Sequence, residues 1–217
     1  FFLPTNNVKI FICLVMRIAI FSSLHSYNKG IFGNADTWEQ FISRFTDNEH
    51  IINSKYIRQV ILGNCNPKRH ITYEKYLMDQ ILSMLYDIVA EERLVFFSND
   101  EIVYDMTTAS NLHTLNLVKE CIKERLNSKS KIPFRVELFS LYKISGTDGY
   151  YKKIYQNDRE YNIEFKCLDN YMMPFVLRYF LGQEVNESDR VFYHEGLLSK
   201  FIETPKIEVN LNETIKN

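Results

Sequence analysis

The stretch RLVFFSNDEIVYDM, residues 93–106, decides how this chain is expected to fold. Four apolar residues, four polar ones and a second apolar run predict a β-hairpin, because Ser, Asn and Asp favour tight reversals of the chain. Residues 72–92 before it and 110–126 after it carry apolar side chains at helical spacing, which predicts an amphipathic helix on each side. A long strand is predicted next, over residues 134–144. The order helix, hairpin, helix, strand indicates a mixed α/β protein.

The rest of the chain adds helices and strands of the same kinds. One helix is predicted after Asp36, and another begins near Asp169 and stops at Gly182. A second hairpin is predicted over 150–168, and a short helix from Ser188. Further strands are predicted over Lys9–Val15, Arg17–Ser22 and Ile57–Leu62. We therefore expect an α/β or α+β fold with a mixed sheet flanked by amphipathic helices.

The domain organisation is expected to be simple. Residues 16–145 form an α/β core domain, and residues 146–217 add a β-hairpin and helices to the same domain. Residues 1–15 are interpreted as an upstream extension, because Met16 and the residues after it resemble a natural beginning. The apolar run in this region is broken by Lys9 and Arg17, and it is shorter than the roughly 20 residues that span a bilayer. No membrane association is predicted.

Composition and charge indicate an ordinary globular protein. Of 217 residues, 46% are hydrophobic and 24% are charged, and the net charge of −1 provides no global attraction to nucleic acid or to anionic membranes. The four cysteines show no CxxC spacing, so we expect reduced thiols in a cytoplasmic protein and no zinc site. The bias toward Asn, Lys and Ile is common in AT-rich genomes, including those of viruses and phages.

The turn of the first hairpin carries the residues of greatest chemical interest. Ser98-Asn99-Asp100-Glu101, flanked by apolar strands and placed between two helices, resembles the palm of several nucleotidyltransferases. These are diguanylate-cyclase-type domains, tRNA-histidine guanylyltransferase-like enzymes and lesion-bypass polymerases. The resemblance covers about a third of the chain. It implies a palm or ferredoxin-like core, with Asp100 and Glu101 as catalytic residues and as ligands of Mg²⁺ or Mn²⁺.

A two-metal site needs oxygen ligands from neighbouring strands, which converge without flexible chain between them. The palm pattern places another Asp at the end of the first strand, whereas this chain has Ser22, Ser23 and His25 there. Asp105 lies four residues from Glu101 along a strand, or ~13 Å away, which is too far to share a metal ion. The alternative is that Asn99 and Asp100 simply form the turn.

Basic residues near aromatic ones suggest a phosphate or nucleic-acid surface. We expect Lys68, Arg69, Lys152 and Lys153 to contact phosphates. Tyr151 would then stack against a base. A solvated hairpin face would have the same composition, so this alternative remains open.

The loop after the first strand is a second candidate phosphate site, because helix N-termini bind phosphates. Its lining would be Ser22, Ser23, His25 and Lys29. The loop contains neither the G-x-G-x-x-G pattern nor a P-loop, so no dinucleotide cofactor is indicated. An ordinary loop between a strand and a helix is the alternative.

The leading hypothesis is a protein that handles nucleotides or nucleic acid, with divalent-metal-dependent phosphoryl or nucleotidyl transfer as its catalytic form. The rival hypothesis is a non-catalytic accessory factor, viral or phage-like, that binds nucleic acid or protein. A third option is a Rossmann-like enzyme with a small-molecule substrate, which the start MRIAIFSS suggests. Motifs of hydrolase triads are absent from the sequence.

Overall fold

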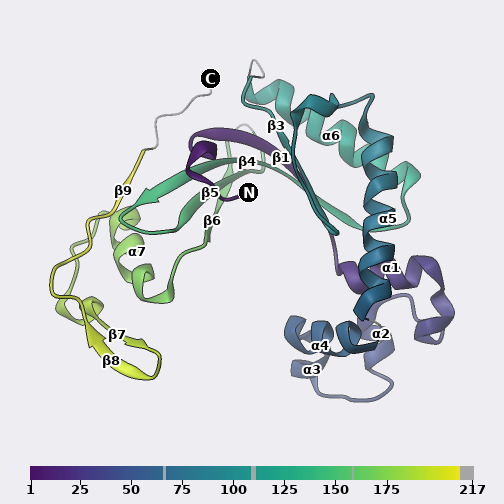
Figure 1. The fold of residues 1–217 in the computed structure, drawn as a ribbon, viewed down its shortest axis with the longest axis horizontal. Helices are drawn as coiled ribbons and strands as arrows, with labels where there is room; N and C mark the ends of the chain where they lie inside the picture. Colours follow the sequence, from purple (N-terminus) through teal and green to yellow (C-terminus); the bar gives the residue numbers. More distant parts are fainter. Residues whose placement is uncertain (66, 109–110, 158, 211–217) are drawn as a thin grey trace. The chain divides into compact units, whose positions relative to one another are not determined.

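The computed structural model describes residues 1–65, 67–108, 111–157 and 159–210, and of residues 65 and 67–69 it describes only the backbone (Figure 1). The α-helices in this part are α1 (Ala19–Tyr27), α2 (Trp38–Ile42), α3 (Glu49–Asn53), α4 (Lys55–Cys65), α5 (Pro67–Leu85), α6 (Leu112–Lys129) and α7 (Met173–Leu181). Short 3-10 helices are η1 (Pro4–Asn6), η2 (Lys29–Phe32), η3 (Glu91–Arg93), η4 (Asn170–Met172) and η5 (Glu187–Arg190).

The strands form one large sheet and one separate hairpin. They are β1 (Lys9–Met16), β2 (Leu94–Phe97), β3 (Glu101–Asp105), β4 (Phe134–Ser145), β5 (Tyr150–Tyr155), β6 (Tyr161–Lys166), β7 (Val191–His194), β8 (Leu197–Lys200) and β9 (Glu208–Val209). In the seven-stranded sheet the order is β2-β3-β1-β4-β5-β6, with β9 paired to β4, whereas β7 and β8 form a separate two-stranded sheet. The expected fold class, a sheet combined with helices, is confirmed.

The sheet is antiparallel. The pairs β2–β3, β4–β5, β5–β6 and β4–β9 all run in opposite directions. At one end of β1, Met16 N–H donates to Asp100 O, and at its other end Ile10 O accepts from Met106 N–H, so β1 is antiparallel to β3. The first four strands follow the order β-α-β-β-α-β, with β3 between β1 and β2. This is the split β-α-β arrangement.

The described residues divide into two compact units that alternate along the sequence. Unit 1 comprises residues 1–11, 105–116 and 138–217, and unit 2 comprises residues 12–104 and 117–137. Strands β1, β3 and β4 each contribute residues to both units. The expected boundaries at residues 15 and 145 follow the chain consecutively, whereas these units do not.

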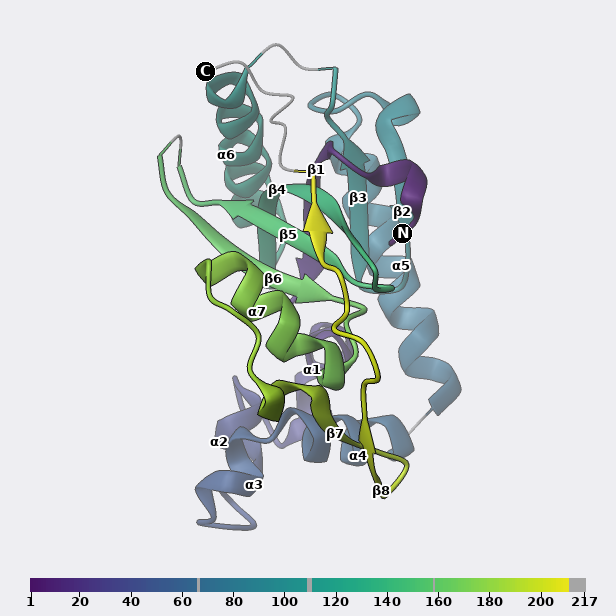
Figure 2. The same cartoon turned by 90° about the vertical axis from the view of Figure 1, so that its left-hand side faces the viewer.

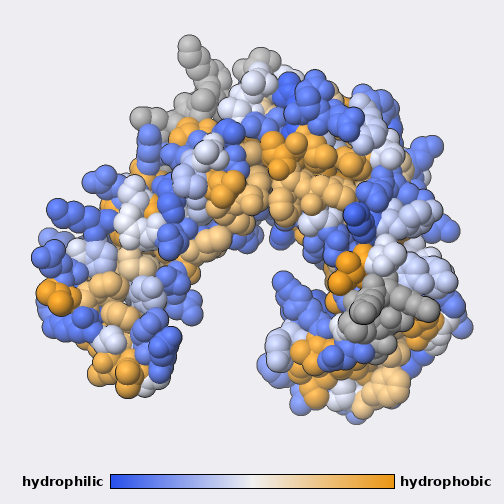
Figure 3. Space-filling model, viewed as in Figure 1, coloured by the Kyte–Doolittle hydropathy of each residue, from blue (hydrophilic) through white to orange (hydrophobic). Residues whose placement is uncertain are grey.

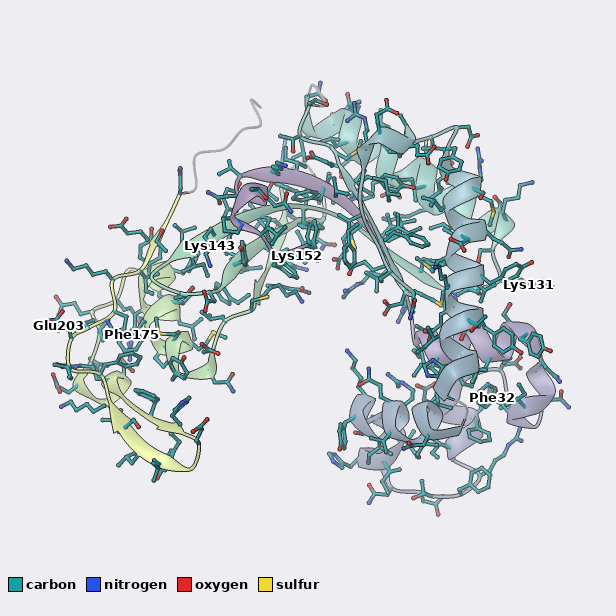
Figure 4. All side chains as sticks on the ribbon, in the orientation of Figure 1. Phe32, Lys131, Lys143, Lys152, Phe175 and Glu203 are labelled. Atoms are coloured by element: carbon teal, nitrogen blue, oxygen red, sulfur yellow. The ribbon has the colours of Figure 1, made fainter. Side chains whose placement is uncertain are left out.

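Unit 2 has a helical core beside its part of the sheet. A buried cluster joins α1, η2, α2 and α4 and consists of Phe21, Leu24, Phe32, Ala35, Trp38, Ile42 and Leu62. The Trp38 indole N–H donates to Ile52 O at 2.9 Å, so this fully buried ring leaves no unpaired donor. Phe32, labelled in Figure 4, packs its ring 4.4 Å from that of Phe21.

In unit 1, helix α7 packs on one face of β4, β5 and β6 (Figure 2). Tyr151 of β5 stacks on Phe180 of α7 with ring centroids 4.8 Å apart, and Val176 is fully buried in the same cluster. Pro174 lies in the first turn and Gly182 ends the helix in the left-handed conformation, as expected. The predicted hairpin over 150–168 is confirmed as β5 and β6.

Residues 1–15 contribute to the sheet. β1 lies between β3 and β4, and its residues from Ile10 to Leu14 are buried. Phe1 packs against Phe11 at 4.9 Å between ring centroids, and Asn7 Oδ1 accepts a hydrogen bond from Lys143 N–H at 2.8 Å. The segment that was interpreted as an upstream extension is therefore part of the folded structure.

Two predicted strands are wrong. Arg17–Ser22 is mostly helical, because Ile18 turns the chain and α1 begins at Ala19, burying Phe21 and Leu24. Ile57–Leu62 lies inside α4, where helical spacing brings Ile61 and Leu62 to the core of unit 2. Short apolar runs fit either structure, and here the packing of the helix outweighed the β-propensity of Ile and Val.

The end of the chain also differs from the expectation. The predicted short helix from Ser188 is the 3-10 helix η5, and the β7–β8 hairpin that follows it was not predicted. Figure 3 shows apolar surface at this end of unit 1, where Tyr193, Leu197 and Leu198 are exposed. Throughout the part that the structure describes, each helix is too short or too polar to cross a membrane.

Candidate functional site

The acidic turn is stabilised by its own side chains. Ser98 Oγ donates to Asp100 Oδ1 at 3.1 Å and accepts from the N–H groups of Asp100 and Glu101 at 3.4 and 3.1 Å. Ser98 N–H also donates to Glu101 O at 2.9 Å, which closes the reversal. The turn therefore has the structural role that its composition predicts, and it also fixes the position of the Asp100 carboxylate.

The two acids of the turn have different surroundings. The Cys13 thiol, fully buried on β1, donates to Glu101 Oε1 at 2.9 Å. Asp100 is exposed and lines a cavity of about 480 Å³ that lies entirely within unit 2. The expected pair of equivalent ligands is thus divided into one carboxylate bound to a neighbouring strand and one that faces the cavity.

A third carboxyl group faces Asp100 from helix α5. Glu74 lines the same cavity with only 5% of its surface exposed. Burial, and to a smaller extent the nearby charge of Asp100, raises the pKa of Glu74 to about 7. His70 Nδ1 lies 3.6 Å from Glu74 Oε1, too far for a hydrogen bond, and burial lowers the pKa of this imidazole. A carboxyl group that titrates near neutral pH can both accept and donate a proton.

The N-terminus of α1 opens onto the cavity. Ile18, which precedes the helix, has φ 51° and ψ 51°, a left-handed conformation that is rare for a β-branched residue, and it offers no side-chain cap. Among the described residues, the N–H groups of Ala19, Ile20 and Phe21 find no acceptor. These residues line the cavity. Free N–H groups at a helix N-terminus attract phosphate and other anions.

Two cations lie on another wall of the cavity. Lys55 and Arg58 belong to α4, and Gln59 and Leu62 of the same helix line the cavity with them. Residues 55, 58, 59 and 62 follow the i, i+3, i+4, i+7 spacing of one helix face. Neither cation forms an ion pair within the described part of the chain. Both charges are therefore available to an anionic ligand.

The carboxylates around the cavity fit only some kinds of metal site. In the described residues, no three His, Cys, Asp or Glu side chains converge as a ready-made metal site. Mg²⁺ is commonly held by only one or two carboxylates together with the phosphates of a substrate. Asp100, with Glu74 beside it, meets that smaller requirement, whereas Glu101 is bound by Cys13. The residues fit a metal ion that enters together with a phosphate ligand.

Of the predicted basic residues, Lys152 and Lys153 lie away from this cavity, in unit 1. The side chains of Lys68 and Arg69 fall outside the described residues. Lys152, labelled in Figure 4, is 6% exposed, and its Nζ lies 4.3 Å from the centre of the Phe139 ring. Lys153 Nζ lies over the ring of Tyr161 at 4.4 Å. These two lysines contact aromatic rings of the sheet in unit 1.

Tyr151 is buried rather than presented to solvent. Its ring is 3% exposed and stacks on Phe180, so the expectation that it stacks against a base is corrected. The physical reason is that helix α7 covers the face of β5 to which Tyr151 belongs. The tyrosine pattern of β5 reflects core packing on this face.

Sequence reasoning missed Glu74, Lys55 and Arg58. A signal for Glu74 exists, because it lies four and seven residues before Met78 and Ile81, which are buried on the same face of α5. A carboxyl group on a buried helix face is a candidate for a shifted pKa. Arg58 was missed because a strand was wrongly predicted over 57–62, and Lys55 was missed because the helix α4, which begins at this residue, was not predicted.

No family model, curated protein or solved structure matches this chain.

Proposed function

We propose that the protein binds a nucleotide through its phosphates, together with a divalent cation, in the cavity of unit 2. The phosphates face the free N–H groups of Ala19, Ile20 and Phe21, and Lys55 and Arg58 neutralise their charge. Asp100 would hold the cation, which would help to neutralise the charge of the phosphates. The observation that carries this proposal is a single cavity that combines an uncapped helix N-terminus, two free cations and an acidic turn.

The topology supports a relation to the palm of nucleotidyltransferases. The sheet order β2-β3-β1-β4 and the element order β-α-β-β-α-β agree with the ferredoxin-like core that the resemblance implies. The acidic turn follows β2 and lies beside the end of β1, where Met16 N–H donates to Asp100 O. Fold-level likeness alone does not define a function, so the proposal rests on the cavity.

Phosphoryl or nucleotidyl transfer is the reaction class that the donor set favours. A bound Mg²⁺ or Mn²⁺ would supply charge neutralisation at the transferred phosphorus. Glu74, which titrates near neutral pH beside Asp100, is placed to accept the proton of an attacking hydroxyl group. Free thiols at Cys13, Cys121 and Cys167 support the expected location in a reducing cytoplasm.

Isothermal titration calorimetry with each nucleoside triphosphate, in Mg²⁺ and again in EDTA, tests the proposal. We expect binding in Mg²⁺ that weakens about tenfold or more in Lys55→Ala and in Arg58→Ala, a loss of about 1.4 kcal/mol or more for each charge. Lys75→Ala is the matched control, because this exposed lysine of α5 does not line the cavity. Its affinity is expected to equal that of the unmodified protein.

Two results would contradict the proposal. Equal affinities in the three lysine and arginine variants would place the nucleotide elsewhere. If the folded protein, checked by circular dichroism, gives no binding heat with any of the four triphosphates, the proposal of nucleotide binding is refuted. Binding that is unchanged in EDTA would show that the metal has no role in binding. This result would favour a non-catalytic binding protein.

A further inference from the structure

Unit 2 has a second cavity, which lies on the other side of helix α1 from the first. Its volume is about 450 Å³, close to the 480 Å³ of the first. Ser22, His25 and Lys29, which the sequence suggested as a phosphate-binding lining, all face it, whereas Ser23 does not. The sequence thus identified a real cavity, and the proposed function does not use it.

The two cavities share a wall. Ile18 and Phe21 line both of them, so the cavities are neighbours separated by two apolar side chains. Ile18 is held in the left-handed conformation at this point. Strained backbone of this kind persists only where the surrounding structure holds it, and it is concentrated at functional sites.

The second cavity combines apolar walls with basic side chains. Ile132 and Pro133, which precede β4, contribute apolar surface on one side, and Lys131 beside them is exposed (labelled in Figure 4). Lys131 forms no ion pair within the described residues. Lys29 pairs with Asp36, and Glu39 adds a further negative charge to the lining. One free cation beside apolar walls suits a sugar and base with a single phosphate better than a triphosphate.

We propose that the two cavities bind two linked nucleotides of one ligand, so that the ligand is a dinucleotide or the end of a single strand. This inference rests on the proposed function, because the first cavity holds the first nucleotide. The second nucleotide lies past Ile18 and Phe21, and the phosphate that joins it to the first meets Lys131. Each cavity has the size of a typical small-ligand site.

Calorimetry in Mg²⁺ with ligands of increasing length tests this inference. The probes are a nucleoside monophosphate, the 5′-phosphorylated dinucleotide and the tetranucleotide of the base that binds best. We expect the dinucleotide to bind about tenfold tighter than the monophosphate, and the tetranucleotide to add less than a further threefold if two positions are specific. Lys131→Ala is expected to remove the gain of the dinucleotide while leaving the monophosphate affinity unchanged.

A second variant is included because removal of the single charge of Lys131 could change the affinity for the dinucleotide only slightly. Ser26 is exposed and lines the second cavity, so Ser26→Trp should fill its mouth without disturbing the core. It is expected to abolish the gain of the dinucleotide and to leave monophosphate binding intact. Lys75→Ala again serves as the control, with the gain retained.

The outcomes separate this inference from the proposed function. If the monophosphate binds and the dinucleotide binds no tighter, the second cavity is not part of the site and the proposed function stands. A gain that survives both Lys131→Ala and Ser26→Trp also overturns the inference, because the second nucleotide then lies elsewhere. If none of these probes binds while a triphosphate still binds in Mg²⁺, the inference is overturned and the proposed function stands. If the triphosphate does not bind either, the proposed function itself fails.

Discussion

The Cys13 thiol on β1 donates a hydrogen bond to the Glu101 carboxylate at the start of β3, with 2.9 Å between the two side-chain atoms. This contact connects neighbouring strands next to the acidic turn and fixes the side chain of Glu101. Asp100, one residue earlier, lines the cavity instead. Adjacent acids of one turn therefore have separate roles, and substitution of each should have a different effect.

Asp100→Asn is expected to weaken nucleotide binding in Mg²⁺ about tenfold or more, because the carboxylate proposed to hold the cation is lost. Glu101→Gln is expected to change the affinity less than threefold, because an amide oxygen can still accept from the Cys13 thiol. Calorimetry of both variants in Mg²⁺ measures the difference. Asp79→Asn, on the exposed side of α5 away from the cavity, is the matched control. Equal losses in Asp100→Asn and Glu101→Gln would contradict separate roles.

Glu74 gives the folding stability a specific pH dependence. Its pKa is about 7 in the folded protein, against the ordinary value of 4.5. Between these two values the folded state binds more protons than the unfolded state, so this group lowers the free energy of unfolding as the pH rises from about 4.5 to 7. Above pH 7 the full cost of burying the ionised Glu74 carboxylate lowers the stability, and below pH 4.5 this cost is absent.

Glu74→Gln removes this ionisable group while keeping its shape. The variant is expected to be more stable than the unmodified protein at pH 8, by about 2–3 kcal/mol, with little difference at pH 4.5. Urea denaturation at several pH values measures this. Glu92→Gln, at an exposed carboxyl of η3, should show no such trend. A constant difference between the Glu74 variant and the unmodified protein at all pH values would argue against the burial of a charged carboxylate.

Features that depend on neighbouring residues could be predicted from the sequence. The 93–106 hairpin, the long strand at 134–144 and the helix that stops at Gly182 rest on turn residues, periodicity and caps, all of which are local. The strand prediction over Arg17–Ser22 was wrong because the four apolar residues 18–21 are too few to show a period that separates helix from strand. Only the packing of Phe21 and Leu24 into a helical core decided it.

The site was harder to predict because it is assembled from distant segments. Asp100 could be proposed from its turn, whereas its neighbour Glu74 lies on a helix 26 positions earlier, and Lys55 on another helix before that. These three residues lie at one cavity because of the way α4, α5 and β3 pack, and no local sequence pattern predicts that packing. The prediction that Tyr151 stacks against a base was wrong for a related reason, because α7 buries this ring through tertiary packing.

The first residues of the chain are expected to stabilise the sheet. Asn7 Oδ1 accepts from Lys143 N–H at 2.8 Å, and Val8 N–H donates to Leu141 O at the same distance. Asn7→Ala should lower the free energy of unfolding by about 1–2 kcal/mol, because the N–H of Lys143 loses its acceptor. Denaturant titration measures the loss. Thr5→Ala, at an exposed neighbouring position, should cost less than about 0.5 kcal/mol. Equal stability of the two variants would show that the Asn7 contact is unimportant in solution.

Gly146 and Gly182 provide a matched test of the turn after β4. Both have positive φ, 78° and 62°, so an alanine at either site pays the cost of a left-handed conformation, about 1–2 kcal/mol. A Cβ at Gly146 would also collide with the carbonyl oxygen of Lys206, whereas one at Gly182 would meet no described atom within 4 Å. Gly146→Ala should therefore lose at least about 1 kcal/mol more than Gly182→Ala in denaturant titrations. Equal losses would mean that the segment before β9 does not hold its close approach to the β4–β5 turn.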